Sequence, residues 1–202
     1  MRFAFERKLW QQGYKLVAGI DEVGRGPLAG PIVAAAVVFP PNIKLRGLED
    51  SKKVSAAKRE ALALKIKQRA LAIGISQVSH KKIDELRIGK ADLLAMKQAV
   101  VGLQFLPDYL LIDGKRNQLD LEIEQLCLID GDARCASVAA ASIVAKVFRD
   151  KIMLEYHKKY PDYLFHQHKG YGTRAHIKKI KQYGPCPIHR RSFFPVSQFA
   201  QT

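Results

Sequence analysis

The sequence predicts one α/β domain, and three observations support this prediction. Apolar runs of strand length occur at residues 16–20, 32–39 and 109–112, with Gly or Pro residues near their ends. Residues 90–103 instead place their apolar side chains at helical spacing. With 202 residues, 48% of them hydrophobic, the chain has the size and composition of a single folded domain with at most a small appendage.

The charge balance points to a polyanionic partner. Lys and Arg number 34 against 19 Asp and Glu, a formal charge of +15, which favours nucleic acid first and an anionic membrane second. No apolar segment reaches the roughly 20 residues of a membrane span, and the first residues lack the apolar core of a signal peptide. Three cysteines without a C-x-x-C pair indicate neither a disulfide framework nor a zinc site. We therefore expect a cytoplasmic protein.

The first elements lead into an acidic loop. Residues 3–12 are predicted to form a short helix, and the strand at 16–20 runs into Asp21 and Glu22 before a glycine-rich stretch. Neighbouring side chains on a straight strand point to opposite faces, so we expect a bend just after Asp21 to bring both carboxylates into one site. The acids suit metal ions, and the bare-backbone loop beside them, which carries Arg25, suits phosphate. The alternative is a charged surface turn.

The remaining elements follow in order. The uniformly apolar strand at 32–39 is expected to be covered on both faces of a sheet. Ser55 is a good N-cap for the next helix, and the preceding Ser51, Lys52 and Lys53 either hold phosphate or, as these residues alone favour, form a solvated surface. Downstream we predict a helix at 56–69, a strand at 70–79, helices at 80–87 and 90–103, a strand at 109–114, and a long helix from residue 137.

Acidic residues end three of the predicted strands. Asp113 precedes a glycine, and the run at 126–129 leads into Asp130 and Asp132, which repeats the pattern at Asp21. If these strands lie side by side with their C-terminal ends together, the acids converge at the edge where ligands bind. A single such Asp is commonly a cap or turn residue. Three of them without Cys or His ligands favour Mg²⁺ or Mn²⁺, and in a basic protein this predicts a metal-dependent nuclease or phosphoryl-transfer enzyme.

The C-terminal part of the chain is the most basic. Between residues 157 and 191 there are nine Lys and Arg residues and one Asp. Tyr163, Phe165 and further aromatic residues up to position 194 interleave with them, as expected of a surface that grips a nucleic-acid backbone. A solvated basic helix is the alternative. Tyr171 lies between two glycines, so we expect it to be exposed.

Several segments match the motifs of a known family. They are Gly19-Ile20-Asp21-Glu22-Val23-Gly24-Arg25-Gly26-Pro27, Asp50-Ser51-Lys52-Lys53, Leu111-Ile112-Asp113-Gly114, Gly131-Asp132-Ala133, the run 139–147, His168-Lys169-Gly170-Tyr171-Gly172-Thr173 and the run 183–190. In this order, which covers nearly the whole chain, they resemble the motifs of type 2 ribonuclease H, the bacterial ribonuclease HII.

The resemblance implies a fold and an activity. The fold would be ribonuclease H-like and α/β, a five-stranded mixed sheet flanked by helices, with residues 1–160 as the catalytic domain and 161–202 as a basic C-terminal helical extension packed on it. The activity would be cleavage of the RNA strand of RNA–DNA hybrids and nicking 5′ of single ribonucleotides embedded in duplex DNA. Hydrolysis with two Mn²⁺ or Mg²⁺ ions would leave 3′-hydroxyl and 5′-phosphate ends.

The resemblance also assigns roles by motif match. The metal-binding catalytic acids would be Asp21, Glu22, Asp113 and Asp132. The segment Gly24, Arg25 and Gly26 would sense the ribose 2′-hydroxyl, the group that distinguishes RNA from DNA, and Tyr171 would lie against the sugar beside the scissile phosphate. The groups that would hold the backbones are Ser51, Lys52, Lys53, Lys169 and the basic tail.

Three positions depart from the family pattern. Val23 stands where Ala is usual, Cys186 where Ser is common, and Asp130 where Lys often occurs, which either alters the metal preference or leaves a charge that points away. Asp150 is expected to pair with Arg149 or another base rather than to bind metal. The alternatives are a DNA-directed nuclease or resolvase of the same fold, and a non-catalytic nucleic-acid-binding protein. We expect a monomer, because no apolar surface stripe demands association.

Overall fold

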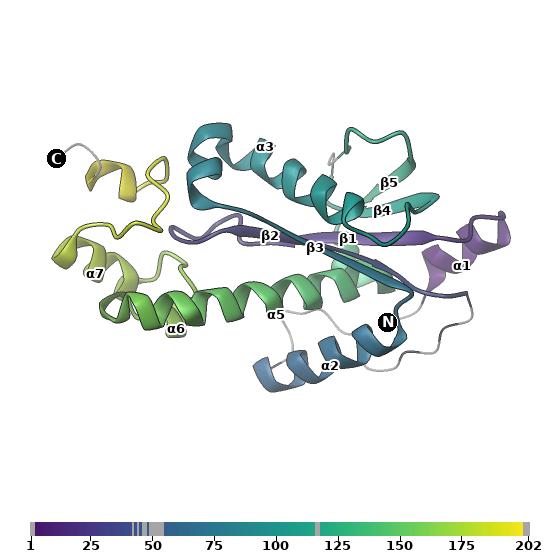
Figure 1. Cartoon of the computed structure of the whole chain (residues 1–202), viewed down its shortest axis with the longest axis horizontal. Coiled ribbons are helices and arrows are strands. Elements are labelled where there is room, and N and C mark those ends of the chain that lie inside the picture. The colour runs from purple at the N-terminus through teal and green to yellow at the C-terminus, as the bar shows by residue number, and fades with distance from the viewer. Residues whose placement is uncertain are drawn as a thin grey trace.

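The computed structural model describes residues 3–41, 43, 45, 48, 55–115 and 118–199. A central sheet lies between helical layers, with the C-terminal elements at one end of the molecule and α1 at the other (Figure 1). The elements are α1 (Ala4–Gln11), β1 (Val17–Val23), β2 (Ile32–Val38), α2 (Ala56–Arg69), β3 (Ala72–Val78), α3 (His80–Val101), β4 (Tyr109–Asp113), β5 (Glu124–Leu128), α4 (Gly131–Arg134), α5 (Ala136–Lys159), η1 (Pro161–Tyr163), α6 (Phe165–His168), α7 (Arg174–Tyr183) and η2 (Val196–Phe199).

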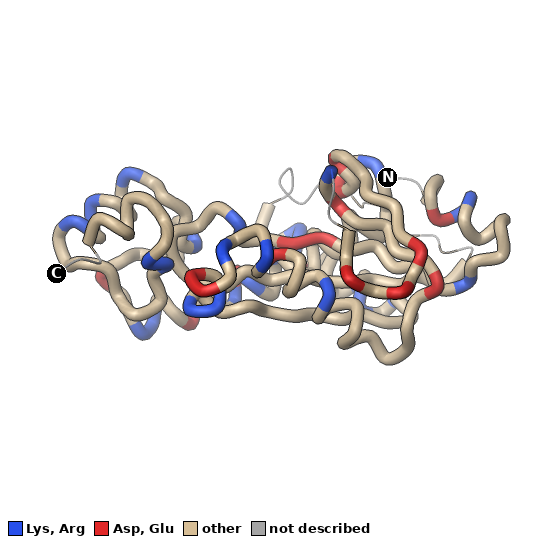
Figure 2. The backbone as a smooth tube through the Cα atoms, turned by 90° about the horizontal axis from the view of Figure 1, so that it is seen from above, with Lys and Arg blue, Asp and Glu red and all other residues tan. Residues whose placement is uncertain are grey.

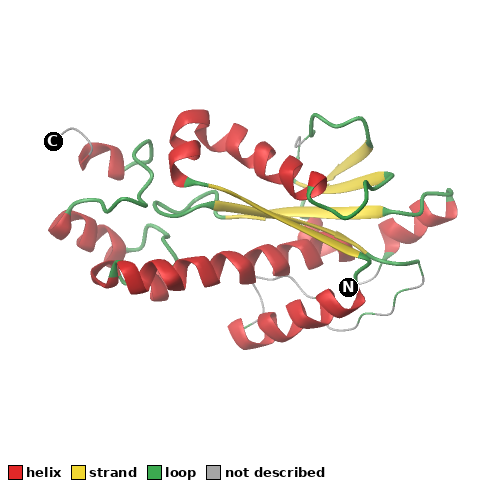
Figure 3. Cartoon of the chain, viewed as in Figure 1, coloured by secondary structure: helices red, strands yellow, loops and turns green. Residues whose placement is uncertain are grey.

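The sheet is mixed, with five strands in the order β3-β2-β1-β4-β5. Figure 3 shows the strands in yellow with helices on both sides. β1 pairs antiparallel with β2, and β2 pairs antiparallel with β3. β4 and β5 run parallel to β1, so the C-terminal ends of these three strands meet at one edge of the sheet. This confirms the predicted mixed sheet and the side-by-side arrangement of the strands that carry or precede the acids.

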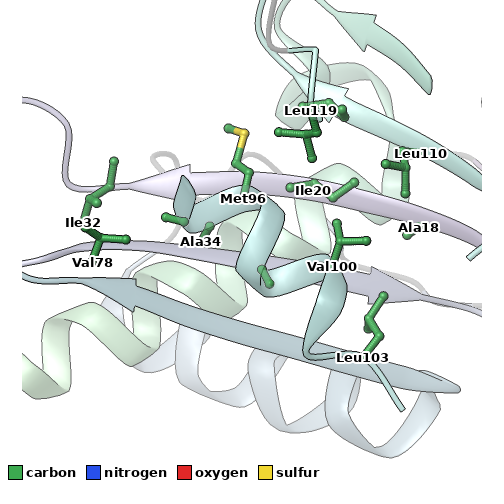
Figure 4. Close-up of a cluster of buried hydrophobic side chains, with 14 of the residues drawn as sticks. Ala18, Ile20, Ile32, Ala34, Val78, Met96, Val100, Leu103, Leu110 and Leu119 are labelled. Carbon is green, nitrogen blue, oxygen red and sulfur yellow. The ribbon is translucent and has the colours of Figure 1, made fainter. Parts of the chain in front are cut away.

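Both faces of the sheet are covered. On one face, Ile20 of β1 packs in a cluster with Met96 and Val100 of α3 (Figure 4). On the other face, Val33 and Val37 of β2 pack with residues of α2 and α5. Every residue of β2 is buried, as predicted for an apolar strand without alternation.

Helix α5 lies very close to β1. A Cβ atom added to Gly19 would lie 2.2 Å from the carbonyl carbon of Ser137, so only glycine fits at this crossing. The buried Glu6 of α1 fixes the start of α5, because its Oε1 accepts from Ser137 N–H at 2.7 Å and from Ser137 Oγ at 2.8 Å. The run of small residues that follows Ser137 is consistent with this close approach.

The predicted elements occur close to their expected positions. Ser55 caps α2 through Oγ, which accepts from Lys58 N–H at 3.3 Å. The two helices predicted at 80–87 and 90–103 form one assigned helix, α3, but Arg87 at φ 66° interrupts its helical backbone. Among the described residues, no helix has both the length and the apolarity to cross a bilayer.

The tail has a hydrophobic cluster of its own. Tyr163, Phe165 and Ile180 pack with Leu28 of the β1–β2 loop and Met153 of α5. Tyr163 and Phe165 are therefore core residues, and the expectation that they belong to an exposed nucleic-acid surface is wrong. In the sequence these aromatic residues resemble exposed ones, but they hold the tail against the β1–β2 loop and α5.

Substituting Gly19 tests the β1–α5 crossing. We expect Gly19→Ala to lower the free energy of unfolding by about 3 kcal/mol, since a methyl group must displace backbone atoms of α5. Gly89→Ala is the matched control: no heavy atom lies within 4 Å of its added Cβ, and Ala should stabilise helix α3 slightly. Urea denaturation measures both variants, and equal stabilities would contradict the close contact.

Candidate active site

Three carboxylates meet at the C-terminal edge of the sheet. Asp21 and Glu22 lie near the end of β1, and Asp113 ends the neighbouring strand β4. Each offers an oxygen atom within 4.8 Å of the oxygens of the other two. Asp21 is only 4% exposed, and Glu22 and Asp113 are partly buried. Carboxylate oxygens this close repel one another unless a cation lies among them.

The acids converge without the bend that the sequence suggested. β1 continues to Val23, and Asp21 and Glu22 remain paired with Ala35 and Ala34 of β2, so the predicted bend after Asp21 is wrong. The parallel pairing with β4 ends at Ile20 instead. Beyond Ile20, β1 has no paired neighbour on the β4 side. The carboxylates of Asp21 and Glu22 therefore lie close to that of Asp113 at the end of β4.

The electrostatics of this group fit a bound cation. Burial, with the charges of Glu22 and Asp113, raises the pKa of Asp21 well above its usual range, while a hydrogen bond from Ser142 opposes the rise. Burial also raises the pKa of Glu22, which Arg25 opposes and Asp113 reinforces. Glu22 Oε2 is buried and has no hydrogen-bond partner among the described residues. An oxygen-only set with an unused buried oxygen is a suitable donor set for a hard divalent cation.

Asp132 lies beside this group rather than within it. It belongs to the short helix α4 and is 6% exposed, but it is not among the acids that lie within 4.8 Å of one another. The preceding residue links α4 to the site, because Gly131 N–H donates to Asp113 Oδ1 at 2.7 Å. Asp130 is exposed and adopts a left-handed conformation at φ 53°.

A further acid was not anticipated from the sequence. Asp92 of α3 is 1% exposed, its Oδ2 lies 3.0 Å from Arg25 Nη1, and its Oδ1 has no partner among the described residues. Burial and then the charge of Glu22 raise the pKa of Asp92 to about 7, against the opposing charge of Arg25. The sequence does contain one indication of this acid: Asp92 lies four residues before Met96, so in a helix it shares the apolar face that packs in the core.

Residues 24–31, between β1 and β2, form a loop that we call the glycine-arginine loop, and it lies between the acids and the tail. Arg25 Nη1 is 3.8 Å from Glu22 Oε1, so Glu22 and Asp92 both attract the same guanidinium. Gly24 has φ 102°, which favours glycine, and an added Cβ would lie 2.4 Å from Arg149 Nε. The half-exposed ring of Tyr171 lies beside Gly26, where an added Cβ would be 3.9 Å from Tyr171 Cε1. The structure thus brings Tyr171 next to the loop.

Two fully buried arginines hold this loop by its carbonyl oxygens. Arg149 donates to three carbonyls and Arg190 to three others, and neither forms an ion pair within the part of the chain that the structure describes. The acceptors for Arg149 are Pro31 at 2.9 Å, Lys169 at 3.0 Å and Ala29 at 3.1 Å. Those for Arg190 are Gly24 at 2.6 Å, Arg25 at 2.9 Å and Gly30 at 3.0 Å. Burial lowers the pKa of Arg149 to about 10 and of Arg190 to about 9, so both remain cationic at neutral pH.

The other predicted binding groups are placed only in part. Lys169 is half-buried, and its ammonium group donates to the carbonyl of His166. Ser51, Lys52 and Lys53 lie outside the described residues. Asp150 pairs with Lys146 at 2.6 Å and with Arg59 at 3.6 Å. Its expected pairing with a base is therefore present.

The remaining bases of the tail form a charged end of the molecule. Figure 2 shows Lys and Arg positions gathered around the C-terminal elements, while many of the acidic positions lie elsewhere along the molecule. Arg174 and Lys178 of α7 are exposed, as is Tyr183, the last residue of this helix. Arg190 is the exception, since it is fully buried and unavailable to a polyanion.

Comparison with known proteins gives one family. The ribonuclease HII family model matches residues 18–196. A ribonuclease HII of Lactobacillus delbrueckii subsp. bulgaricus is 53% identical over 197 residues, which cover 98% of this chain and 76% of that protein. The crystal structure of ribonuclease H2 from Pyrococcus horikoshii OT3 has a TM-score of 0.79 and 28% identity, over 91% of this chain and 96% of that one.

A more distant likeness concerns the fold alone. The crystal structure of Bst-RNase HIII in complex with Mn²⁺ has a TM-score of 0.65 and 19% identity, over 94% of this chain and 70% of that one.

The crowding of like charges predicts that removing one of them stabilises the metal-free protein. We expect Asp113→Asn to raise the free energy of unfolding by about 1 kcal/mol at neutral pH in a chelator, because the remaining carboxylates lose a repulsive neighbour. The amide oxygen can still accept from Gly131 N–H. The gain should shrink as the pH falls, since the raised pKa values of Asp21 and Glu22 mean that these groups protonate early.

The control for this measurement is Asp120→Asn. Its carboxylate is 98% exposed and, among the residues that the structure describes, pairs with Lys97 alone, so the stability should change little. Denaturation with urea in chelator and then in excess Mg²⁺ should reverse the advantage of Asp113→Asn. A destabilised Asp113→Asn protein in chelator would contradict the repulsion.

Proposed function

The chain belongs to the ribonuclease HII family of metal-dependent endoribonucleases, and from that membership we propose which of its residues carry out the reaction. It is a type 2 ribonuclease H that acts on RNA–DNA substrates. We infer that it cleaves the RNA strand of hybrids and nicks 5′ of single ribonucleotides in duplex DNA. The observation that carries the assignment of roles is the group of three carboxylates beside the glycine-arginine loop.

The proposed metal-binding catalytic acids are Asp21, Glu22, Asp113 and Asp132. The mutual distances and the unused oxygen of Glu22 support the first three, and the link from Gly131 to Asp113 supports the nearby Asp132. The ions are proposed to be Mn²⁺ or Mg²⁺, which prefer oxygen ligands. When bound, such ions supply an activated water and stabilise the leaving oxygen of a phosphodiester.

Recognition of ribose is proposed for the loop that adjoins the acids. Gly24, Arg25 and Gly26 are proposed to contact the sugar 2′-hydroxyl. At Gly26 an added Cβ would meet only Tyr171 Cε1 at 3.9 Å, so a sugar can approach this backbone closely, whereas Gly24 packs on Arg149 and fixes the shape of the loop. Tyr171 lies beside this loop and is exposed, which suits packing against the sugar. Lys169 and the exposed bases of α7 are proposed to hold the nucleic-acid backbones, and the same role for Ser51, Lys52 and Lys53 stays a prediction.

The wider organisation is proposed on similar grounds. Residues 1–160 would form the catalytic domain and 161–202 an extension packed on it, supported by the hydrophobic cluster in which tail residues pack on Leu28 and Met153. A monomer in the cytoplasm is proposed as well, and all three cysteines are free, which suits a reducing compartment.

Cleavage of matched duplexes tests the proposed function. With Mn²⁺ or Mg²⁺, the protein should nick a DNA duplex that contains one ribonucleotide and leave the all-DNA duplex intact, because only the former offers a 2′-hydroxyl to the loop. Gel analysis of labelled strands measures the cleavage. Equal cutting of both duplexes would indicate a DNA-directed nuclease instead.

The Asp113→Asn variant tests the assignment of the acids. We expect its turnover to fall by at least about 100-fold while its affinity for the ribonucleotide duplex changes little, because a metal ligand is lost and the basic surface is kept. Single-turnover cleavage and fluorescence anisotropy measure the two quantities. Unchanged turnover would remove Asp113 from the catalytic group.

Asp92 is proposed to keep Arg25 away from the metal ligands. Its Oδ2 lies closer to Arg25 than Glu22 Oε1 does, 3.0 Å against 3.8 Å. Asp92→Asn should let Arg25 pair with Glu22, and the Mg²⁺ concentration for half-maximal cleavage should rise roughly fivefold, as expected for a coupling of about 1 kcal/mol.

An Arg25→Ala background shows whether Asp92 acts on the bound Mg²⁺ through Arg25 or directly through its own charge. In that background Asp92→Asn should shift the half-maximal Mg²⁺ concentration much less, since no guanidinium remains to be transferred. Equal shifts in the two backgrounds would show that Asp92 acts without Arg25.

A further inference from the structure

Residues 169–173, between α6 and α7, form a loop that we call the Tyr171 loop. Three histidines and one cysteine form a buried polar cluster next to it. His176, His189 and His168 are 0%, 1% and 8% exposed, and Cys186 is 7% exposed. None of them belongs to the acidic site or to the exposed basic surface. Buried polar groups are normally hydrogen-bonded, so their partners show what the cluster holds.

The neighbours of His176 determine where its proton lies. His176 Nδ1 is 2.9 Å from the carbonyl oxygen of Tyr171, which can only accept, so Nδ1 carries the proton and donates. In a neutral ring Nε2 is then an acceptor. His189 Nε2 lies 3.0 Å from it and must therefore be the donor.

The same logic extends to Cys186. With its proton on Nε2, His189 has an accepting Nδ1, and Cys186 Sγ lies 3.1 Å away as the donor. The nearby Cys186 carbonyl, 3.3 Å from Nδ1, already accepts from His189 N–H at 3.0 Å. A proton on His189 Nδ1 would leave two bare nitrogens facing each other, unless His176 also changed tautomer and abandoned the Tyr171 carbonyl.

Burial keeps these groups neutral. It lowers the pKa of His176 to about 4 and of His189 to about 3, and it raises the pKa of the Cys186 thiol to about 11. At neutral pH the thiol therefore has a proton to donate and neither ring has a second one. A directed series of hydrogen bonds, the Cys186–His189–His176 chain, runs from the thiol to the carbonyl of Tyr171.

His168 holds the same loop from a second side. Its ring stacks on His176 with centroids 4.3 Å apart and an angle of 18°. His168 Nδ1 accepts from Gly170 N–H at 3.2 Å, and Nε2 donates to the Tyr163 carbonyl at 2.8 Å. The two imidazoles thus contact the backbone on consecutive residues of the Tyr171 loop.

We propose that the Cys186–His189–His176 chain is a positioning device for Tyr171, with the Tyr171 carbonyl setting its direction and the Cys186 thiol supplying the last donor. By fixing the Tyr171 carbonyl, the chain fixes where the Tyr171 ring meets the sugar of the substrate. This inference rests on the substrate contact proposed for Tyr171, whereas the direction of the chain does not.

Nitrogen NMR of the histidine-labelled protein tests the direction of the chain without substrate. Near neutral pH, ¹⁵N shifts and ring couplings should show the Nδ1–H tautomer for His176 and the Nε2–H tautomer for His189. Cys186→Ser keeps a donor and should keep both tautomers. Cys186→Val removes the donor to His189 Nδ1 but leaves the Tyr171 carbonyl, so both tautomers should persist and only the ¹⁵N shift of His189 Nδ1 should change. The opposite tautomers in the unaltered protein would overturn the chain.

Cleavage kinetics test what the chain does for Tyr171. On a duplex with one ribonucleotide, Cys186→Val should raise KM roughly fivefold, the effect of one hydrogen bond, with little change in kcat. Cys186→Ser should restore the original KM. If Cys186→Val does not fold, Cys186→Ala serves the same purpose, with far-ultraviolet circular dichroism as the check on folding.

A Tyr171→Ala background distinguishes the two ways in which the experiment can fail. There, Cys186→Val should add no further change in KM, because the positioned ring is absent. If Tyr171→Ala itself leaves KM unchanged, the proposed substrate contact of Tyr171 is wrong. If Tyr171→Ala raises KM and Cys186→Val does not, the positioning role of the chain is wrong.

Discussion

The active region depends on two buried guanidinium groups that are held by backbone carbonyls instead of carboxylates. Removing such charges from water costs much more than a single hydrogen bond returns, so each must satisfy several donors at once. Arg149 and Arg190 do so with six carbonyls drawn from residues 24–31 and Lys169. The loop must keep the shape that turns its carbonyls inward. Gly24, at φ 102° and against Arg149, is part of that shape.

This arrangement makes the tail part of the site. Arg149 comes from α5 and Arg190 from the tail, and the β1–β2 loop lies between them. Backbone bonds close the same contact: Leu28 N–H donates to the Gly170 carbonyl and Gly30 N–H to that of Ile188. The acids are fixed independently by the sheet. In the proposed assignment, the metal-binding acids lie at the end of the sheet, and substrate recognition belongs to loops that the tail holds against it.

Much of the fold followed from local patterns, because strand runs and helix caps depend on neighbouring residues. The convergence of Asp21, Glu22 and Asp113 was also predictable, since parallel strands place their C-terminal ends at one edge. The bend predicted after Asp21 was wrong because a single strand does not show where its neighbour ends. The pairing of β1 with β4 stops at Ile20, and this leaves room for the side chains of Asp21 and Glu22 beside Asp113. Asp92 was missed, because its ion pair with Arg25 joins segments far apart in the sequence.

The sequence by itself determined the order of elements, the strand-end acids and the basic character of the tail, since these follow from composition and periodicity. The tertiary structure decided which charges serve the surface and which serve the interior. Arg190 and Tyr163 resemble their exposed neighbours in sequence, yet both are buried. The proton positions of His176 and His189 were likewise set by partners brought together only in the fold. The physical reason is that the cost of burying a polar group depends on partners that are distant in the chain.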